Sequence, residues 1–269
     1  MSDLVLAERR GAVLVLTLNR PERLNAWTDA LEERYYAELD AAEDDPHIRA
    51  IVVTGAGRGF CAGADMDELE RGATGETGEA DAALRNRPRP RTFPLTVRKP
   101  MIAAINGAAA GLGLVEALYC DVRFAVPEAK LTTAFARRGL VAEYGLSWIL
   151  PRLVGYGTAL DLLLSSRVVL GAEAARLRLV DRLSEPGRVV DDAVAYAEEL
   201  AVYSSPWSMA TIKAQIQADL ERSFGDAVAA ADELMIRSFH RPDVREGVNS
   251  YLERRAPAFP SLDSRSQTS

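Results

Sequence analysis

The sequence predicts an α/β protein with a helical C-terminal part. Short apolar runs rich in β-branched residues alternate with helical segments through the first half of the chain. Two strand-to-helix junctions, near residues 61–66 and 107–113, are crowded with glycine and alanine. From about residue 145 onward the pattern is mostly helical. The length of 269 residues is enough for one large α/β domain with a sizeable core.

In the first half, residues 13–18 predict a strand that ends in a turn at 19–21. A helix over 28–42 follows, with Thr28 as its N-cap and with Glu32 and Glu33 in the first turn, where the helix dipole favours negative charge. Residues 50–54 predict a buried strand that leads directly into a glycine-rich segment. The strongest local signal therefore lies at the end of a strand.

Residues 72–98 combine weak periodicity with several prolines and glycines, so we expect a mobile loop or an irregular insertion that covers the substrate pocket. Beyond it we expect a strand over 100–105, a helix over 108–119 and a strand over 120–126. Further helices are expected at 146–153, 157–165, 172–178, 189–203, 208–222, 225–238 and 242–255. We divide the chain into a core (1–200), a helical region (201–257) and a flexible tail (258–269).

The composition disfavours several classes of function. The chain is 48% hydrophobic and 26% charged, as in ordinary globular proteins. Its net charge of −7 argues against nucleic-acid binding, which needs a dense basic face. With no signal-like start and no run of about 18 apolar residues, we expect a cytoplasmic protein without membrane contact. Two cysteines and two distant histidines, His47 and His240, disfavour a disulfide scaffold and a metal site.

The segment GRGFCAGADM (57–66) has three possible roles. A phosphate loop would need lysine followed by serine or threonine after the glycines, and neither is present. Cys61 as a nucleophile would need a nearby base, and an isolated cysteine is more often a small buried hydrophobe. The third role uses peptide N–H groups, because small side chains let a substrate carbonyl approach the backbone.

The second junction, NGAAAGLG (106–113), supports this third role. The N–H groups in the first turn of a helix lack partners and lie at the positive end of its dipole. One donor from each junction would form an oxyanion hole. Close helix packing through small residues is the more common explanation of either segment when each is considered alone.

Six ordered segments together resemble the crotonase (enoyl-CoA hydratase/isomerase) superfamily. They are NRPERLNA (19–26), GFCAGADM (59–66), PMIAAING (100–107), CD (120–121), PRLVG (151–155) and EGVNSYLERRAPAF (246–259). The resemblance covers about residues 4–260. It implies a ββα spiral of two near-perpendicular sheets, a C-terminal helical trimerisation region, and a homotrimer or a dimer of trimers. It also implies an acyl-CoA substrate, with coenzyme A as part of the substrate and no separate cofactor.

The resemblance assigns the two oxyanion donors to the backbone N–H groups of Ala64 and Leu112, although glycine is usual at position 112. The two glutamates of the hydratases fall on Val115 and Phe135, so both hydratase acids are missing. Glu143 matches the catalytic aspartate of dienoyl-CoA isomerases and of a chlorobenzoyl-CoA dehalogenase. Alternatively, Glu143 lies at the N-terminus of a helix only because the helix dipole stabilises a negative charge there.

The remaining site predictions concern substrate contacts. Asp65 is expected to fix its loop by accepting backbone N–H bonds. Glu116 is rotated by about 100° from the hydratase position and is not expected to substitute for it, and His240 is expected at a surface or interface. Trp27, Tyr144 and Trp148 are either core or pocket wall. The resemblance places the following residues along the coenzyme A and acyl channel: Arg23, Leu24, Ala26, Ala62, Asp65, Met66 and Gly111. It also places Arg255 at a basic position that contacts a CoA phosphate, often the phosphate of CoA bound to a neighbouring subunit.

These predictions favour one reaction class over several others. A single base beside a stabilised enolate is sufficient to move a double bond, whereas hydration ordinarily uses two acids. We therefore expect a double-bond isomerase that uses Glu143, rather than a two-glutamate hydratase. A hydrolase of CoA thioesters or β-diketones and a non-catalytic acyl-CoA-binding protein are the alternatives from other classes.

Overall fold

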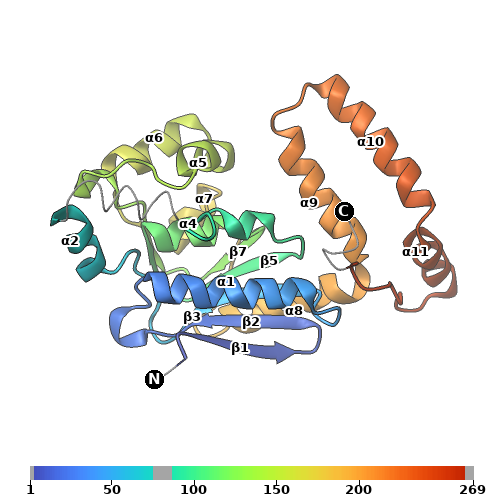
Figure 1. Ribbon diagram of the computed structural model, residues 1–269, viewed down its shortest axis with the longest axis horizontal. Helices are drawn as coiled ribbons and strands as arrows, with labels where there is room; N and C mark the ends of the chain where they lie inside the picture. The colour runs from blue at the N-terminus through green and yellow to red at the C-terminus, as the bar shows by residue number, and fades with distance from the viewer. Residues whose placement is uncertain (1–2, 75–86, 264–269) are drawn as a thin grey trace.

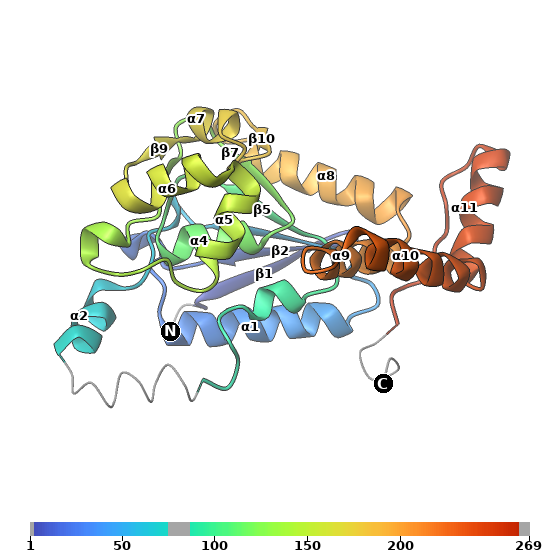
Figure 2. The ribbon, with the colours of Figure 1, turned by 90° about the horizontal axis from the view of Figure 1, so that it is seen from above.

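The computed structural model describes residues 3–74 and 87–263 (Figures 1 and 2). The larger of two sheets has the strand order β1-β2-β3-β5-β7-β10. β1 is antiparallel to β2, and the other neighbouring pairs are parallel. The strands are β1 (Val5–Arg10), β2 (Val13–Leu18), β3 (Ala50–Gly55), β5 (Met101–Ile105), β7 (Val122–Ala125) and β10 (Arg182–Leu183). The three central strands after β2 are almost wholly buried, which explains their continuous apolar sequences.

The smaller sheet has the order β4-β6-β8-β9. Its strands are β4 (Gly59–Cys61), β6 (Ala108–Ala110), β8 (Lys130–Thr132) and β9 (Val169–Leu170), with only β8 and β9 antiparallel. Along the chain, each of β3, β5 and β7 in the larger sheet is followed by a strand of the smaller sheet and then by helical structure. This repeated strand-strand-helix order matches the expected ββα spiral, and it brings the two glycine-rich junctions side by side.

Ten α-helices and three 3-10 helices are described. The α-helices are α1 (Asp29–Asp44), α2 (Met66–Thr74), α4 (Leu112–Tyr119), α5 (Leu146–Val154), α6 (Tyr156–Ser165), α7 (Gly171–Arg176), α8 (Val189–Tyr203), α9 (Pro206–Asp219), α10 (Phe224–Phe239) and α11 (Pro242–Glu253). The 3-10 helices are η1 (Pro21–Arg23), η2 (Phe93–Thr96) and η3 (Ala136–Arg138). Most of these agree closely with the predicted ranges.

Helix α1 begins where the sequence predicts. The Thr28 side chain accepts a hydrogen bond from the Leu31 N–H at 3.2 Å, which confirms Thr28 as the N-cap. Leu31, Tyr35 and Leu39 recur every four residues and are all buried, so they form the core-facing stripe of the helix. Glu32 is also buried, which the dipole argument alone does not explain.

The predicted helix over 108–119 is wrong in its first turn. Ala108–Ala110 is strand β6, which pairs with β4 and β8, and α4 begins only at Leu112. Gly111 separates the two elements with a backbone φ of 49°, a conformation that glycine adopts without strain. Alanine favours helix locally, but pairing on both sides of β6 outweighs that preference. The short strands β1, β4, β8, β9 and β10 were not predicted.

The segment predicted as an irregular insertion at 72–98 is partly described. Its start belongs to α2, and its end contains η2 with Phe93 buried against the ring of Tyr36, at 5.1 Å between centroids. Residues 75–86 lie outside the described part. In the predicted tail, the Arg49 guanidinium donates to the Phe259 carbonyl at 2.7 Å and the Ser261 hydroxyl to the Pro46 carbonyl at 2.8 Å. Residues 264–269 are not described.

Helices α9, α10 and α11 form an arm that stands beside the two sheets rather than on them (Figures 1 and 2). By contrast, α8 packs against β2, β3 and β5 of the larger sheet. In the described ranges, no helix combines the length and the apolar character needed to span a membrane.

Candidate active site

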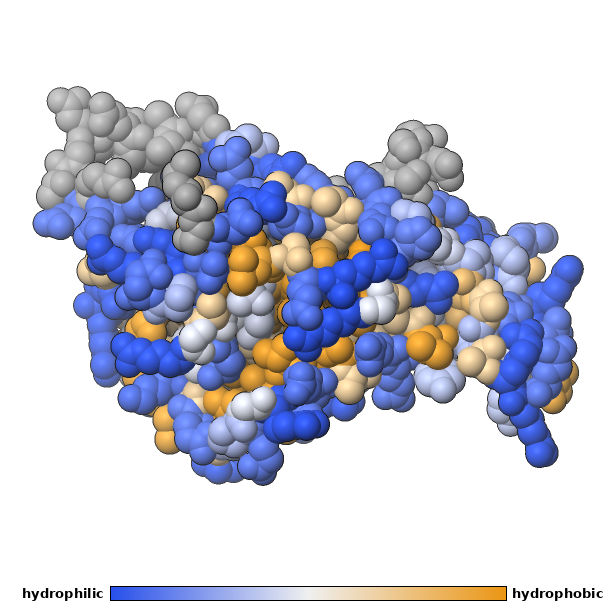
Figure 3. All heavy atoms as spheres, turned by 90° about the horizontal axis from the view of Figure 1, so that it is seen from below, coloured by the Kyte–Doolittle hydropathy of each residue, from blue (hydrophilic) through white to orange (hydrophobic). Residues whose placement is uncertain are grey.

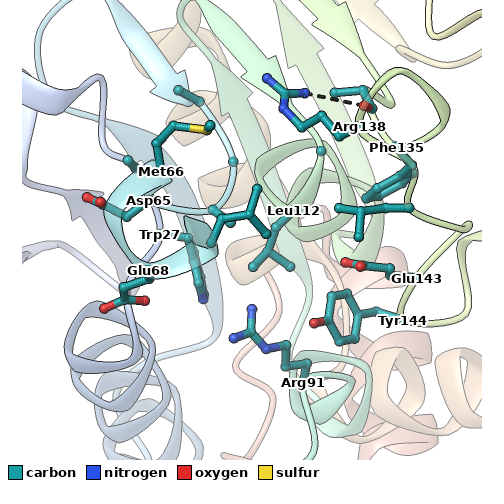
Figure 4. Close-up of a pocket in the computed structure, with 18 of the residues that line it drawn as sticks. Trp27, Asp65, Met66, Glu68, Arg91, Leu112, Phe135, Arg138, Glu143 and Tyr144 are labelled. Atoms are coloured by element: carbon teal, nitrogen blue, oxygen red, sulfur yellow. Dashed lines mark hydrogen bonds between the residues drawn. The ribbon is translucent and has the colours of Figure 1, made fainter. Parts of the chain in front are cut away.

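The structure has a cavity of about 760 Å³ (Figure 4). One wall is formed by α2 and the segment that precedes it, and the opposite wall by the segment between β8 and α5. Most of the predicted site residues meet there. The predicted residues in its lining are Arg23, Ala26, Trp27, Ala62, Ala64, Asp65, Met66, Gly111, Leu112, Glu143 and Tyr144. The cavity therefore brings both glycine-rich junctions and Glu143 into one space.

Ala64 presents its backbone N–H away from the neighbouring chain segment. Trp27 forms an isolated parallel bridge with Ala64, in which the Trp27 N–H donates to the Gly63 carbonyl at 2.7 Å and the Trp27 carbonyl accepts from the Asp65 N–H at 2.9 Å. In a parallel bridge, the residue between these two contacts turns its own N–H and carbonyl to the other side. Ala64 lines the cavity, and its N–H donates to no backbone acceptor in the described part of the chain, so Ala64 is the first candidate donor.

Leu112 supplies the second candidate donor, because it is the first residue of α4. The N–H groups in the first turn of a helix have no partner within the helix and lie at the positive end of its dipole. Gly111, with its φ of 49°, turns the chain from β6 into this helix. Leucine in place of the usual glycine keeps the N–H, and the Leu112 side chain becomes part of the cavity wall (Figure 4).

Two glycines bring the junctions together. A Cβ added to Gly63, whose φ is 95°, would lie 2.7 Å from the Ala110 carbonyl oxygen and 3.7 Å from the Leu112 nitrogen. A Cβ added to Gly113 would lie 2.2 Å from the Cys61 carbonyl oxygen. Any larger residue at these positions would push the two segments apart. The small residues of both junctions thus serve the close approach of two backbones.

Asp65 fixes the first junction, as predicted, and it has a partner that the sequence did not indicate. Its carboxylate accepts from the Asp67 N–H at 3.1 Å and from the Arg20 guanidinium at 2.9 Å. The same guanidinium donates to the Ala26 carbonyl at 2.5 Å. These contacts hold the pKa of Asp65 below its ordinary value, although burial opposes them. Asp65 is therefore held as a carboxylate in an ion pair beside Ala64.

The two positions of the missing hydratase acids are buried and apolar. Val115 lies within α4, and Phe135 contributes its side chain to the cavity lining. Neither side chain can exchange a proton with a substrate. The acid-base chemistry of this cavity must come from another residue.

Glu143 is that candidate. It lines the cavity and is partly buried, and its carboxyl group forms no hydrogen bond or ion pair with any residue in the described ranges, whereas its backbone carbonyl accepts from the Leu146 N–H at 2.9 Å. Burial raises the pKa of Glu143, and the positive charge of Arg91 opposes this rise. Asp29 also lines the cavity, but it pairs with Arg87 at 2.8 Å, as Asp65 pairs with Arg20. Glu143 is thus a carboxyl group with its proton-accepting oxygens available.

Arg87 and Arg91 line the cavity and were missed from the sequence. Both belong to the segment expected to cover the pocket, and their ion-pair partners, Asp29 and Glu32, lie more than fifty residues earlier. The dense run RPRPR (87–91) was the available signal. The charge of this run does not identify Asp29 and Glu32 as the ion-pair partners, because only the tertiary fold brings them close to it.

Aromatic side chains complete the wall. Trp27 is 2% exposed and donates from its indole N–H to Glu32 at 2.9 Å, so it is both core and pocket wall. The Tyr144 carbonyl accepts from the Tyr119 hydroxyl at 2.6 Å, and the backbone of Tyr144 has a φ of 52°. Figure 4 shows Glu143, Tyr144 and Arg91 facing the same space as Leu112.

Several predicted residues do not contribute to the cavity within the described part of the chain. Leu24, Trp148 and Arg255 lie outside its lining. Trp148 instead lies under the Arg152 guanidinium at 3.8 Å, and Arg255 pairs with Glu246 and Glu253. His240 is the C-cap residue of α10.

Cys61 and Glu116 are also excluded from the lining. Both are fully buried, and burial raises the pKa of the Cys61 thiol to about 12, so the nucleophilic thiolate is absent at neutral pH. Among the residues that the structure describes, no cluster of histidine, cysteine or acidic side chains is suited to hold a metal ion.

The chain was compared with known proteins. The family model described as enoyl-CoA hydratase/isomerase matches residues 8–262. The chain is 33% identical to the 1,2-epoxyphenylacetyl-CoA isomerase of Escherichia coli over 96% of this chain and 99% of that protein. It is 32% identical to the short-chain-enoyl-CoA hydratase of Clostridium acetobutylicum over 93% and 95%. A crystal structure of an enoyl-CoA hydratase from Mycobacterium marinum matches with a TM-score of 0.69 and 49% identity, over 82% of this chain and all of that one.

These matches span nearly the whole chain and agree with the strand-strand-helix order and the paired glycine-rich junctions. The similar proteins include both an isomerase and hydratases, so they define the family and not the reaction. The chain belongs to the crotonase (enoyl-CoA hydratase/isomerase) family of acyl-CoA enzymes.

Proposed function

We propose that this protein is an acyl-CoA double-bond isomerase in which the backbone N–H groups of Ala64 and Leu112 hold the thioester oxygen and Glu143 moves the proton. The observation that supports this proposal most is the Glu143 carboxyl group, which has no hydrogen-bond or ion-pair partner among the described residues, in a cavity where both hydratase positions are apolar. A full-length relative at 33% identity is named an isomerase, although of an epoxide-bearing CoA ester rather than of an enoyl-CoA, so its name supports isomerisation on this fold and not the movement of a double bond.

The reaction follows from the geometry. With a 3-enoyl-CoA bound, the Glu143 carboxylate takes a proton from C2, and the electron pair of the broken C–H bond spreads onto the thioester oxygen. Two preorganised N–H donors in a site that excludes water each stabilise such an oxyanion by a few kcal/mol. The Glu143 carboxyl then returns the proton to C4, so that the double bond moves from C3–C4 to C2–C3. No other reactant is consumed.

Partial burial suits Glu143 to this role. A carboxylate with a raised pKa is a stronger base than an exposed one and still ionises near neutral pH, which favours proton transfer in both directions. The apolar walls formed by Leu112, Phe135 and Leu140 surround the acyl chain in this proposal. Arg87 and Arg91, from the described end of the segment at 72–98, line the cavity and would border the acyl end.

Coenzyme A would enter along the first junction. Arg23, Ala26, Ala62 and Met66 line the cavity on the side of Asp65, where the resemblance places the CoA channel. Arg255 lies on the C-terminal side of α11 and does not line this cavity, so it would meet the CoA phosphate of a neighbouring copy.

A homotrimer, or a dimer of trimers, is the assembly that we propose. The arm exposes apolar side chains that a monomer would leave in water, among them Phe224 at 87%, Phe239 at 69% and Leu252 at 71% exposure. On the face shown in Figure 3, apolar residues gather in the middle and recur on the arm. Contiguous exposed apolar surface of this kind is typical of protein interfaces.

The reaction class can be tested with a panel of CoA esters followed by mass spectrometry. We expect (3E)-hexenoyl-CoA to be converted into a product of unchanged mass with the absorbance of a 2-enoyl thioester. A product that has gained one water would instead identify a hydratase, and release of free CoA would identify a thioesterase. Binding of every ester without turnover of any would contradict an enzymatic role.

A further inference from the structure

One of the cations that line the cavity, Arg91, lies outside the two junctions and packs against the segment that carries Glu143. Arg91 lines the same cavity, its side chain is only 11% exposed, and its guanidinium carbon lies 5.1 Å from the centre of the Tyr144 ring. Tyr144 directly follows Glu143, so Arg91 packs against the segment that supports the proposed base. Figure 4 shows the guanidinium and the Glu143 carboxyl facing the same space.

Arg91 is held in place from α1. It contacts Asp29 and Glu32, each at 3.3 Å, and Glu32 in turn accepts the Trp27 indole N–H at 2.9 Å. Tyr36, also on α1, donates from its hydroxyl to the Arg91 carbonyl at 3.0 Å. Both the backbone and the guanidinium of Arg91 are therefore fixed by one helix, which limits the freedom of a long side chain.

Arg87 shares the same two acids but differs in how closely it contacts them. Arg87 lies 2.8 Å from Asp29 and in short contact with Glu32, whereas Arg91 lies 3.3 Å from each. The closer pairs neutralise Arg87 more completely, because the Coulomb energy falls with distance. The charge of Arg91 is thus left more available to a third carboxylate.

We infer that Arg91 is a positioning residue for Glu143, which keeps that carboxyl ionised and fixes its segment by packing on Tyr144. This inference rests on the proposed function, in which Glu143 is the base. The Tyr119 hydroxyl, which donates to the Tyr144 carbonyl, holds the segment from the opposite side.

The charges around Glu143 agree with this assignment. Burial raises the pKa of Glu143, and Arg91 is the cation that lowers it. Burial raises the pKa of Glu116 on α4 well above its ordinary value, and the charge of Arg91 opposes that rise as well. The charged or titratable groups that surround Glu143 and Arg91 are Arg87 on the same segment, Asp29, Glu32 and Tyr36 on α1, Asp65 and Glu68 across the cavity, Glu116 and Tyr119 on α4, Arg138 on η3, and Tyr144.

The test is the pH dependence of kcat/KM with (3E)-hexenoyl-CoA. In the wild type, kcat/KM falls as the pH drops through the pKa of Glu143, because the base becomes protonated. Arg91→Gln removes the cation that favours the carboxylate, so the midpoint of this acidic limb moves to higher pH. Activity below the midpoint then falls by a larger factor than activity on the plateau.

Arg87→Gln is the matched control, since Arg87 forms ion pairs with the same two acids, Asp29 and Glu32. We expect Arg87→Gln to move the midpoint less than Arg91→Gln, whatever its effect on the plateau, and Arg91→Lys to return the midpoint toward the wild-type value. Arg91→Met keeps the aliphatic stem against Tyr144 and replaces Arg91→Gln if circular dichroism shows that the glutamine variant is unfolded.

Two results would overturn the inference: an unmoved midpoint in the folded charge-removing variant, or equal shifts for Arg87→Gln and Arg91→Gln. Glu143→Gln separates this failure from failure of the proposed function. If Glu143→Gln retains activity and the same acidic limb, then Glu143 is not the base and the proposed function is wrong. If Glu143→Gln is inactive while Arg91→Gln has an unmoved midpoint, only the role of Arg91 is wrong.

Discussion

In the proposed function, backbone N–H groups rather than side chains form the oxyanion side of this site. Because Ala64 and Leu112 would act there through their N–H groups, their side chains are free to differ from those expected for the family, as Leu112 does. The neighbouring glycines Gly63 and Gly113, by contrast, cannot be replaced by larger residues without a steric clash. Gly63 combines a φ of 95° with a position where a Cβ would meet the Ala110 carbonyl oxygen at 2.7 Å.

Gly63→Ala should therefore damage catalysis more than stability. The added methyl group separates the two junctions, and we expect kcat for the CoA ester to fall on the order of 100-fold, as for loss of one oxyanion donor. Gly187→Ala is the matched control, because Gly187 has a similar φ of 82° with no atom within 4 Å of the added Cβ. Steady-state kinetics with thermal melts would check this. Equal losses of kcat in both variants would contradict the claim.

The same residues show what the sequence could predict. Ala64, Leu112 and Glu143 line one cavity as predicted, because each belongs to a local sequence signal, a glycine-rich junction or a segment before a helix, that the family resemblance identifies, whereas their catalytic roles stay predictions. Arg87 and Arg91 were not found, because their role depends on Asp29 and Glu32 of α1, which only the tertiary fold brings near. Trp148 was placed near the pocket by its sequence neighbours, but its ring lies under Arg152 outside the lining.

At the scale of elements, helix α4 links the two halves of the site. Its first residue, Leu112, carries the proposed oxyanion donor, and its last, Tyr119, donates from its hydroxyl to the Tyr144 carbonyl next to Glu143. Between them lies Glu116, whose two carboxylate oxygens are buried with no hydrogen-bond partner in the described structure. A buried polar group without a partner costs folding free energy.

Glu116→Met should stabilise the protein, by about 1–3 kcal/mol at neutral pH, because it removes this unpaired buried group. The pKa of Glu116 is raised in the folded state above its ordinary 4.5, so the folded protein retains a proton that the unfolded chain releases. The contribution of Glu116 to the free energy of unfolding then falls as the pH rises above about 4.5, and Glu116→Met removes that contribution.

Urea unfolding at several pH values measures this effect, with Glu198→Gln on the exposed side of α8 as the control. A destabilised Glu116→Met variant at neutral pH would mean that the buried carboxyl has a stabilising partner.

Elements were predicted well where they are long. The amphipathic helices α1, α8 and α10 were found close to their bounds because periodicity over many residues outweighs single exceptions. The strands of the smaller sheet have two or three residues each, too few for a periodic signal, and β6 was taken for helix because alanine favours helix.

At the scale of the whole molecule, the arm of α9–α11 makes few contacts with the two sheets and exposes apolar side chains on α10 and α11. The double variant Ile236→Asp with Phe239→Asp places charges on that surface, where both side chains are more than half exposed. We expect it to dissociate the proposed trimer into monomers, because charges buried at an interface without partners cost several kcal/mol.

Light scattering after size-exclusion chromatography measures the mass. Leu6 lies on the edge strand β1 and is 43% exposed. The variant Leu6→Asp therefore tests whether a new charge elsewhere on the surface also dissociates the assembly. A wild-type protein that is monomeric at micromolar concentration, or a double variant that stays trimeric, would contradict the proposed role of the arm.

The central claim is that one carboxyl group, Glu143, moves the proton beside a stabilised thioester oxyanion. The most direct measurement compares turnover of (3E)-hexenoyl-CoA by the wild type, Glu143→Gln and Glu116→Gln, followed by mass and by 2-enoyl absorbance. We expect wild-type and Glu116→Gln enzymes to form the 2-enoyl thioester with no change in mass, and Glu143→Gln to bind the ester but lose activity by about 100-fold or more. Undiminished isomerisation by Glu143→Gln, or a product that has gained a water, would contradict the account.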